Sequence, residues 1–377
     1  MKLYNTLTRT KEEFTPLDPQ NIRLYVCGVT PYDDPHLGNA RPMVVFDVLF
    51  RLLRHTYGES AVKYARNFTD IDDKIIARAN ELGEDPATLA ERFIHSYHDD
   101  AAALGCLPPT YEPRVSETQV MEGIITFIEK LLKKGSAYEI PGDGIYLDIT
   151  QIDGNDGYQY GKLSGNKLED LVAGARVEAN TAKRNSGDFA LWKLAKPGEP
   201  QWKTPWGAGR PGWHIECSVM SEQLLGDKFD LHGGGEDLQF PHHENEIAQS
   251  VACHGHIHAN VWLHNAFITV GGKRMGKSMG NFTTIKDALE KYSPEAIRLW
   301  LLQTHYRKPV DYSDEALIAA ENRLKKLLPK ALAVTNPAPM PQGFLDALKD
   351  DLNTPKALGK MGSIEETATC LRFLGLL

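Results

Sequence analysis

The pattern of apolar and polar positions divides the first part of the chain into alternating strands and helices. Residues 22–29 (IRLYVCGV) form a short apolar run rich in β-branched and aromatic side chains, which indicates a buried strand. After a turn-rich stretch, residues 43–58 carry apolar side chains at helical spacing. A second strand-like run at 62–69 is followed by a helical pattern at 72–83. This order predicts a parallel sheet of the α/β class, in which ligands bind at the carboxyl ends of the strands.

The middle of the chain has a different pattern. A helical pattern at 117–137 leads into a stretch rich in Gly and Asp, which indicates short strands and turns, so we interpret about 115–200 as an insertion. Residues 203–216 contain too many Gly and Pro for regular structure, although a helical pattern follows at 217–226. Residues 229–238 (FDLHGGGEDL) then indicate a strand that runs into a glycine loop.

Beyond residue 282 the pattern is helical to the end of the chain, with a break near 336–342 (NPAPMPQ) that indicates a linker or a long turn. The chain has 377 residues, which is long for one hydrophobic core. We therefore expect two or three modules.

Charge and composition narrow the classes of function. A net charge of −8 argues against a surface that binds nucleic acid over its whole extent, because neutralising phosphates takes clustered Lys and Arg. The five cysteines are odd in number and widely spaced, unlike a disulfide scaffold, which favours a reducing cytosol. The first residues lack the apolar core of a signal peptide, and no apolar run is long enough to span a bilayer. We expect a cytoplasmic protein with no membrane partner.

The first chemical motif is HLGN at 36–39, directly after the first predicted strand. A small turn containing glycine lets the backbone approach ATP phosphates, while the donors of His36 and Asn39 stabilise charge that develops during nucleotidyl transfer. Alone, such a tetrapeptide is more often a surface turn with an incidental histidine.

The second motif is GGKRMGKSMGN at 271–281. A flexible loop of this kind closes over a triphosphate and neutralises its charge as pyrophosphate leaves, an electrostatic task that needs cations near the phosphates. The side chains available for it are Lys273, Arg274, Lys277 and Ser278. The alternative interpretation is a solvated basic loop.

The third motif is a set of possible metal ligands, namely Cys27, Cys217, His242, His243, Glu244 and Glu246. His242 and Glu246 are four residues apart, which places them on one face of a helix and within reach of one ion. Thiolate, imidazole and carboxylate are ordinary ligands of tetrahedral Zn²⁺. A buried cysteine is commonly just a small apolar residue. Cys27, however, stands at the end of the first strand, where the sheet would place its ligand site.

Together these motifs are far more specific than each one alone. The chain resembles the class I aminoacyl-tRNA synthetases, with HLGN in place of their HIGH motif and RMGKS in place of KMSKS. Within this class it is similar to the cysteinyl-tRNA synthetases. That similarity rests on segments that follow the family's order from residue 3 to about 315: LYVCGVTPYD, RNFTDIDDKI, GDFALWK, GRPGWHIECS, FDLHGGGEDLQFPHHENEIAQS and HYRKPVDYS.

The resemblance implies a fold and a domain order. The fold is α/β, with a Rossmann-like parallel-sheet catalytic domain that is split by an insertion and followed by a helical C-terminal segment. The implied boundaries are a first half of the catalytic domain at 1–115, a connective insertion at 116–202, a second half with the KMSKS-like loop at 203–285, a connector at 286–315 and a short helical remnant of the tRNA-binding bundle at 316–377.

The resemblance also implies an activity, the ATP-dependent activation of L-cysteine to cysteinyl-adenylate and transfer to tRNA(Cys), with Mg²⁺ carried by ATP. We expect a monomer that contacts the acceptor end of the tRNA. One Zn²⁺ per chain is implied, with the ligands Cys27, Cys217, His242 and Glu246. The metal would bind the substrate thiolate and exclude serine, whose hydroxyl is a poor zinc ligand.

Further residues match the family's site positions. The implied amino-acid pocket consists of Gly28, Thr69, Trp213 and His232. The implied catalytic residues are His36, Asn39 and Lys277. The implied nucleotide-binding residues are Gly38, Gly233, Gly234, Gly235, Asp237, Arg274, Lys277 and Ser278. Because the substrate carboxylate attacks the α-phosphate in line, catalysis consists largely of positioning and charge stabilisation.

The sequence departs from the family in its two motifs and at its end. Asn39 replaces the final His of HIGH, and Arg274 and Gly276 replace the first and third residues of KMSKS. We expect modest effects, because Asn39 retains a donor and Arg274 retains the charge. DDLNTP at 350–355 resembles the start of the family's helical bundle, and we expect most of the anticodon-reading half to be missing.

Two alternatives remain. A related ligase of mycothiol synthesis uses the same catalytic core without an anticodon domain to join cysteine to an amino-sugar, and TPYD at 30–33 resembles it. RNFTDIDDKI and FPHHENEIAQS favour the synthetase. The second alternative is a degenerate paralogue that acts as a regulator, against which stand the intact metal positions and Lys277.

Overall fold

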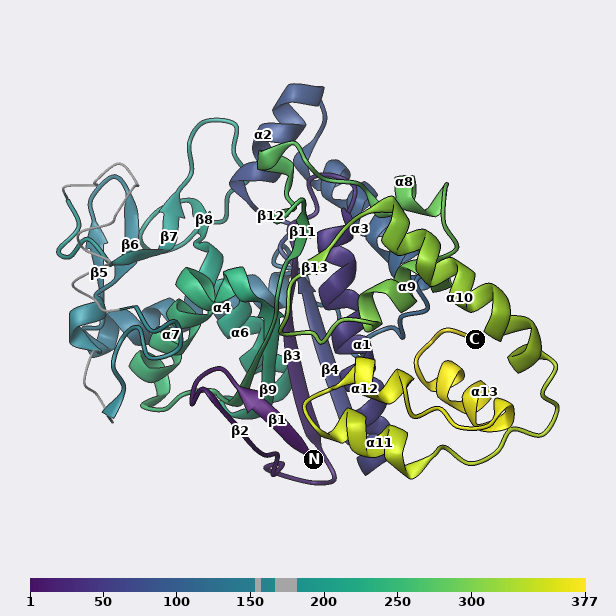
Figure 1. Cartoon of the computed structure of the whole chain (residues 1–377). Coiled ribbons are helices and arrows are strands. Elements are labelled where there is room, and N and C mark those ends of the chain that lie inside the picture. Colours follow the sequence, from purple (N-terminus) through teal and green to yellow (C-terminus); the bar gives the residue numbers. More distant parts are fainter. Residues whose placement is uncertain (153–156, 167–181) are drawn as a thin grey trace.

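The core of the molecule is a four-stranded sheet whose neighbouring strands all run parallel (Figure 1). In the order in which they pair, its strands are β10 (Ala259–Asn265), β9 (Phe229–Gly235), β3 (Ile22–Val29) and β4 (Val62–Phe68). The protein is represented by a computed structural model that describes residues 1–152, 157–166 and 182–377. The predicted strands at 22–29, at 62–69 and in FDLHGGGEDL are confirmed, as is the α/β class.

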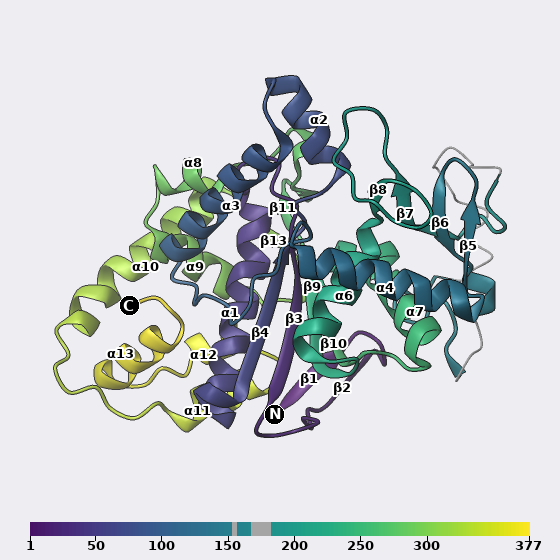
Figure 2. The same cartoon turned by 180° about the vertical axis from the view of Figure 1, so that it is seen from behind.

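Helices cover both faces of this sheet. Side chains along a strand point alternately to opposite sides, so a strand that is apolar throughout needs a cover on each side. On β3, Leu24 and Val26 pack into one hydrophobic core, and Tyr25 and Cys27 into another. The first core contains α1 (Leu37–Tyr57), and the second contains α4 (Thr118–Lys134), α6 (Trp213–Leu225) and α7 (Glu244–His254). In Figures 1 and 2, α1 and α6 accordingly lie on opposite sides of the sheet.

The HLGN motif forms the first turn of α1 and not the separate glycine-containing turn that was predicted. His36 is the N-cap residue in extended backbone, and its N–H donates to Asn39 Oδ1 at 3.0 Å. This capping hydrogen bond helps to start the helix at Leu37, whose side chain is buried in the core. The helix ends at Gly58, which has a φ of +98°. A helix N-terminus therefore lies directly after β3, at the carboxyl edge of the sheet.

A second sheet lies beside the parallel one and is antiparallel throughout. Its strands are β5 (Ala137–Ile140), β6 (Gly144–Leu147), β7 (Phe189–Leu194) and β8 (Gly209–Pro211). Its position in the chain, between β4 and β9, agrees with the predicted short strands and turns. The domain boundaries themselves stay predictions.

The prediction of irregular structure at 203–216 is confirmed for 203–208 and wrong beyond it, because β8 and the start of α6 occupy most of 209–216. The glycines there serve close packing. A Cβ on Gly209 would lie 2.2 Å from the Lys193 carbonyl oxygen, and one on Gly212 would lie 2.0 Å from the Ala190 carbonyl oxygen. Residues without a side chain are thus needed for this segment to lie against β7, and they do not mark a loop.

The chain between the two sheets and after the parallel sheet is largely helical. The helices not yet named are α2 (Asp73–Leu82), α3 (Pro86–Ala103), α8 (Ile285–Leu289), α9 (Pro294–Leu302), α10 (Asp314–Leu332), α11 (Gln342–Lys349), α12 (Thr354–Leu358) and α13 (Ile364–Phe373). The prediction of an all-helical segment beyond 282 needs one correction. The two-residue strand β13 (Val310–Asp311) pairs with β11 (Ile268–Val270), which also pairs with β12 (Lys273–Arg274). Two residues leave no periodicity from which a strand can be predicted.

The C-terminal helices contact the N-terminal hairpin of β1 (Lys2–Asn5) and β2 (Thr10–Glu13), as both views of the molecule show (Figures 1 and 2). The buried carboxylate of Asp351 joins them. Its Oδ1 accepts hydrogen bonds from the Tyr4 N–H at 2.9 Å and from the Tyr306 hydroxyl at 2.8 Å. Its Oδ2 accepts from the Arg307 guanidinium at 2.9 Å. Among the described residues, no helix has the length and apolar character needed to cross a bilayer.

Candidate functional site

A cavity of about 300 Å³ opens at the carboxyl edge of the parallel sheet, where ligand sites of open α/β sheets lie. Its walls come from the end of β3 and the start of α1, from the end of β4, from the start of α6, and from the segments that follow β9 and β10. Both predicted motifs reach it, since His36 and Lys277 are among the lining residues. The sheet therefore gathers the predicted residues at one place.

The four predicted metal ligands converge beside this cavity. The Cys27 Sγ lies 3.6 Å from the Cys217 Sγ and 3.4 Å from the Glu246 Oε1, and the His242 Nε2 lies 3.1 Å from the same Glu246 oxygen. All four side chains are buried, and their ligand atoms lie within 4.8 Å of one another. Two thiols, an imidazole and a carboxyl group are a donor set that suits Zn²⁺. The residues thus fit the metal that the sequence implies.

The helix predicted to carry both His242 and Glu246 begins only at Glu244. His242 belongs to the preceding turn, Gln239–His243, in which Phe240 has extended backbone with a φ of −142°. The kink does not separate the two side chains, because the turn continues into α7. Glu244, also considered as a ligand, accepts hydrogen bonds from the Tyr158 hydroxyl and the Ser164 N–H, at 2.7 and 2.9 Å. It joins the insertion to α7.

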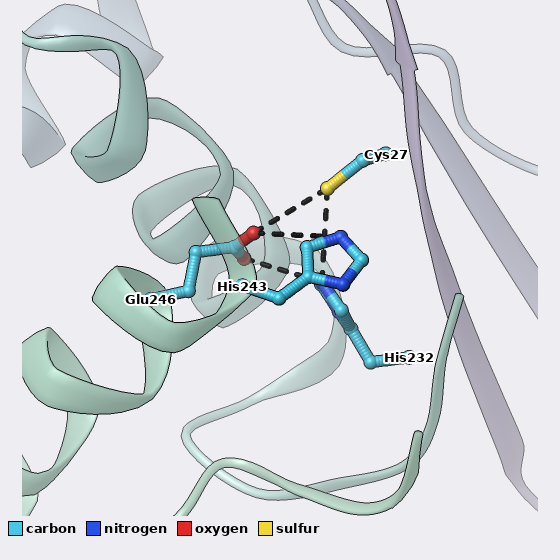
Figure 3. A group of neighbouring side chains, drawn as sticks. All are labelled: Cys27, His232, His243 and Glu246. Atoms are coloured by element: carbon cyan, nitrogen blue, oxygen red, sulfur yellow. Dashed lines mark hydrogen bonds and ion pairs between the residues drawn. The ribbon is translucent and has the colours of Figure 1, made fainter. Parts of the chain in front are cut away.

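A second possible ligand set, drawn in Figure 3, consists of Cys27, His232, His243 and Glu246. The His232 Nε2 lies 3.7 Å from the Cys27 Sγ and 3.3 Å from the Glu246 Oε2. The His243 Nε2 lies 3.9 Å from the Glu246 Oε1 and forms no hydrogen bond with any residue that the structure describes. Its Nδ1 lies 2.8 Å from the His264 Nε2, which fixes the ring orientation. Cys27 and Glu246 are common to both sets, and only the first contains two thiols.

Burial determines the charges of these groups. It raises the pKa of the Cys27 thiol well above its usual value, and the nearby Cys217 adds to this rise. Burial also raises the pKa of Glu246 to about 7 and lowers that of His242 to about 3. The imidazole is therefore neutral, as a metal ligand must be. A divalent metal ion bound there would stabilise the charged forms of the thiol and the carboxyl group.

Three of the four predicted amino-acid contacts line the cavity, namely Gly28, Thr69 and Trp213. The Trp213 ring is 40% exposed and stacks on the His242 ring, with centroids 4.4 Å apart. His232 is fully buried beneath the wall and stacks on the Tyr25 ring at 5.3 Å. A role for His232 through direct substrate contact stays a prediction.

Asn67, which the sequence analysis did not select, connects the pocket to the metal ligands. Its Oδ1 accepts from the Gly28 N–H at 2.9 Å and lies 3.8 Å from the Cys217 Sγ. Its Nδ2 donates to the Thr69 Oγ1 at 3.3 Å. A Cβ on Gly28 would lie 1.7 Å from the Asn67 carbonyl oxygen, so glycine is required there. A lone amide in a strand carries no motif. The polar residue inside an apolar run was the only available indication.

The residues predicted to bind the nucleotide lie at the start of α1 and in the segments after β9 and β11. Burial, together with the charges of Lys277 and Arg274, lowers the pKa of His36 to about 4, so its imidazole is neutral. The His36 Nδ1 is buried without a hydrogen-bond partner in the described structure. A Cβ on Gly38 would lie 2.5 Å from the His36 ring, which explains the glycine of HLGN.

The glycines after β9 have two different environments. Gly235 and Asp237 line the cavity. A Cβ on Gly233 would lie 2.3 Å from the Phe46 ring, and one on Gly234 would lie 2.8 Å from the Leu238 side chain. Packing alone therefore accounts for glycine at 233 and 234, and their contact with a nucleotide stays a prediction.

The predicted mobile loop lies across the cavity mouth. The Arg274 guanidinium lies 3.9 Å from the centroid of the Phe267 ring and donates to the Asp237 Oδ2 at 2.7 Å. The Lys277 ammonium donates to the Asp34 carbonyl oxygen at 2.9 Å. The side chain of Ser278 lies outside the part of the chain that the structure describes.

Comparison with known proteins agrees with this geometry. Residues 13–322 match the family described as tRNA synthetases class I (C) catalytic domain. Curated relatives include the cysteine–tRNA ligases of Thermococcus gammatolerans, 51% identical over 379 residues, and Ruegeria pomeroyi, 52% identical over 366 residues. The chain belongs to the cysteine–tRNA ligase family. These alignments cover 95% and 96% of this chain, and 78% and 77% of the respective relatives.

Solved structures support the same fold. A methionyl-tRNA synthetase of Mycobacterium tuberculosis bound by methionyl-adenylate has a TM-score of 0.66 at 14% identity, covering 93% of this chain and 84% of that one. A putative arginyl-tRNA synthetase of Campylobacter jejuni has a TM-score of 0.54 at 13% identity, covering 95% and 90%. A Rossmann-like catalytic fold is thus common to these chains. Membership of the cysteine–tRNA ligase family also favours the synthetase over the amino-sugar ligase as the function of this chain.

Proposed function

We propose that this chain activates L-cysteine with ATP to form cysteinyl-adenylate and transfers the cysteinyl group to the acceptor end of tRNA(Cys). The observation that carries the proposal is the buried set of Cys27, Cys217, His242 and Glu246 beside a cavity that His36 and Lys277 also line. Soft ligands at one end suit a thiol substrate, and cations at the other suit a triphosphate.

Zn²⁺ is the metal that this donor set would hold, one ion per chain. Bound there, it would form a direct metal–sulfur bond with a substrate thiolate, which the serine hydroxyl cannot match. The chain's own residues supply the rest of the pocket. Trp213, Gly28 and Thr69 line the cavity, and the Asn67 amide hydrogen-bonds to the Gly28 N–H and the Thr69 hydroxyl and so fixes these two residues.

His36 and Lys277 act on the phosphates. The neutral His36 imidazole lines the cavity and would contact a phosphate oxygen, while the Lys277 ammonium would neutralise charge on the departing pyrophosphate. ATP enters with its own Mg²⁺ as a substrate. Asn39 contributes through its cap on the His36 N–H, which keeps the imidazole at the start of α1.

The experiment is to assay cysteine-dependent ATP–pyrophosphate exchange and cysteine attachment to purified tRNA with the same preparation. We expect both reactions, with exchange that requires cysteine. Exchange without tRNA charging, together with ligation of cysteine to an amino-sugar, would contradict the proposed acceptor. Absence of exchange from zinc-loaded protein would contradict the activation step itself.

A further inference from the structure

Asp33 makes an ion pair with the catalytic lysine of the loop, and no part of the proposed reaction uses it. The Lys277 Nζ lies 3.1 Å from the Asp33 Oδ2, donates to the Asp34 carbonyl oxygen and lies 4.7 Å from the centroid of the Tyr32 ring. Three consecutive residues thus surround one ammonium group. They belong to TPYDDP, which joins β3 to α1 and lines the cavity.

The segment that holds Lys277 is itself fixed. The Asp34 Oδ1 accepts from the Lys286 ammonium at 2.8 Å and from the Ser96 hydroxyl at 2.5 Å, which ties the segment to α8 and α3. Pro31 and Pro35 flank it and restrict its backbone. The position of the Asp33 carboxylate is therefore set by the protein frame and not by the loop.

The loop, by contrast, is anchored at Arg274, through its ion pair with Asp237, and at the buried Met275, while its glycines are loosely packed. Gly271, Gly272 and Gly280 have positive φ, and a Cβ added at any of these three, or at Gly276, would meet no atom within 4 Å. Met279 beside them is 60% exposed. Such a segment has high conformational freedom, so its few side-chain contacts decide where it lies. The contact of Lys277 with Asp33 is one of these.

We propose that the Asp33 carboxylate pairs with the Lys277 ammonium when no ATP is bound, and that the ATP triphosphate competes with Asp33 for this ammonium group. The inference rests on the proposed use of ATP. Asp33 is thus a positioning residue that acts through Lys277. It keeps the cation over the cavity, and the triphosphate takes the cation from it on binding.

The magnitude of the contact allows such an exchange. The Asp33 and Lys277 side chains are 33% and 18% exposed, and ion pairs of this kind shift an equilibrium by about fivefold at most. A triphosphate carries several negative charges and offers more than one oxygen to the same ammonium, so it displaces a single carboxylate. The contact therefore weakens ATP binding by a few-fold at most.

The test is equilibrium binding of MgATP, without cysteine, to the full chain and to Asp33→Asn. We expect the dissociation constant of the variant to fall about three- to fivefold, because the competitor is gone. The matched control is Asp34→Asn, which removes the same charge one residue away from a carboxylate that binds Lys286 and Ser96. We expect a clearly smaller change in this control.

The same comparison in a Lys277→Ala background separates competition from simple charge repulsion. Competition predicts that Asp33→Asn has no effect once the ammonium is absent. Three results would overturn the proposal. The first is an equal gain in ATP affinity in both backgrounds, and the second is a gain no larger than that of Asp34→Asn. The third is weaker ATP binding by Asp33→Asn, which would make Asp33 a direct contributor to MgATP binding. Hydrogen exchange of residues 271–281 without ATP provides a second measurement, since it should be faster in Asp33→Asn than in Asp34→Asn.

Cysteine-dependent pyrophosphate exchange by the unaltered chain keeps the two proposals distinct. Its absence would contradict the proposed function. Its presence, with identical ATP affinities for the chain and for Asp33→Asn, would contradict only the role of Asp33.

Discussion

At the scale of single residues, the site combines side chains whose chemistry is visible in the sequence with others whose role depends on their neighbours. Cys27, Cys217, His242 and Glu246 belong to types that bind metals, and the sequence places Cys27 at a strand end. Asn67 has no such mark. Its importance follows from its contacts with Gly28, Thr69 and Cys217. Gly28 and Cys217 are distant from Asn67 in the chain, so these contacts exist only in the folded protein.

The contacts of Asn67 lead to a prediction for substrate affinity. Replacing it with alanine leaves the Gly28 N–H and the Thr69 hydroxyl without their partner, which costs about 1–3 kcal/mol for a buried group. We predict that Asn67→Ala raises the KM for cysteine about tenfold and leaves the KM for ATP nearly unchanged. Steady-state pyrophosphate exchange measures both. An equal rise in the two constants would mean that the substitution disturbs the whole site.

The low pKa of His36 leads to a prediction for pH dependence. Burial shifts it from the ordinary value to about 4, so the imidazole stays neutral above about pH 5 and gains no proton between pH 8 and pH 6. The ratio of the exchange rates of the unaltered chain and of His36→Ala should therefore be constant over this range. A ratio that changes as the pH falls below 7 would place the His36 pKa in the ordinary range.

At the scale of elements, the strands and helices that carry regular periodicity could be predicted from the sequence. The apolar run at 22–29 coincides with β3, because a strand buried on both faces needs apolar residues throughout. The helix α6 was predicted to start at 217 and starts at Trp213, because glycine there serves close packing against β7. The strand β13 is too short to have a pattern, and its pairing with β11 is set by the tertiary structure.

Asp351 provides a prediction for the contact between the C-terminal helices and the rest of the molecule. The Asp351→Asn variant keeps the shape of the side chain and its tolerance of a positive φ, here +65°, but removes the charge that Arg307 neutralises. We predict a loss of about 2 kcal/mol in the free energy of unfolding, because hydrogen bonds to a buried charge are replaced by weaker ones. Denaturant unfolding measures it.

The control for Asp351 is Asp346→Asn on α11, whose exposed carboxylate accepts only from the nearby Gln342 amide, at 2.6 Å, among the hydrogen bonds of the described residues. It should change the free energy of unfolding by no more than about 0.5 kcal/mol. If the two variants are equally stable, the Asp351 contacts do not join the segments as described.

At the scale of the whole molecule, the net charge of −8 leads us to expect that adenylate formation and transfer to tRNA respond differently to salt. Adenylate formation uses groups inside the cavity, which salt screens little. Transfer to tRNA depends on contacts between the RNA backbone and local basic side chains, which salt weakens steeply. We predict that raising the salt concentration from about 50 to 200 mM lowers tRNA charging at least tenfold and pyrophosphate exchange less than twofold. Equal losses would show that salt acts on the cavity.

The central claim is that a metal held by Cys27, Cys217, His242 and Glu246 selects the substrate by its thiol. The measurement that tests it most directly is the ratio of cysteine-dependent to serine-dependent pyrophosphate exchange in the unaltered chain and in Cys217→Ser. The control is Cys253→Ser, which changes another buried cysteine outside the ligand set. The account predicts that the ratio falls at least tenfold in Cys217→Ser, together with the bound zinc, and stays unchanged in Cys253→Ser. An unchanged ratio in Cys217→Ser protein that has lost its zinc would contradict the account.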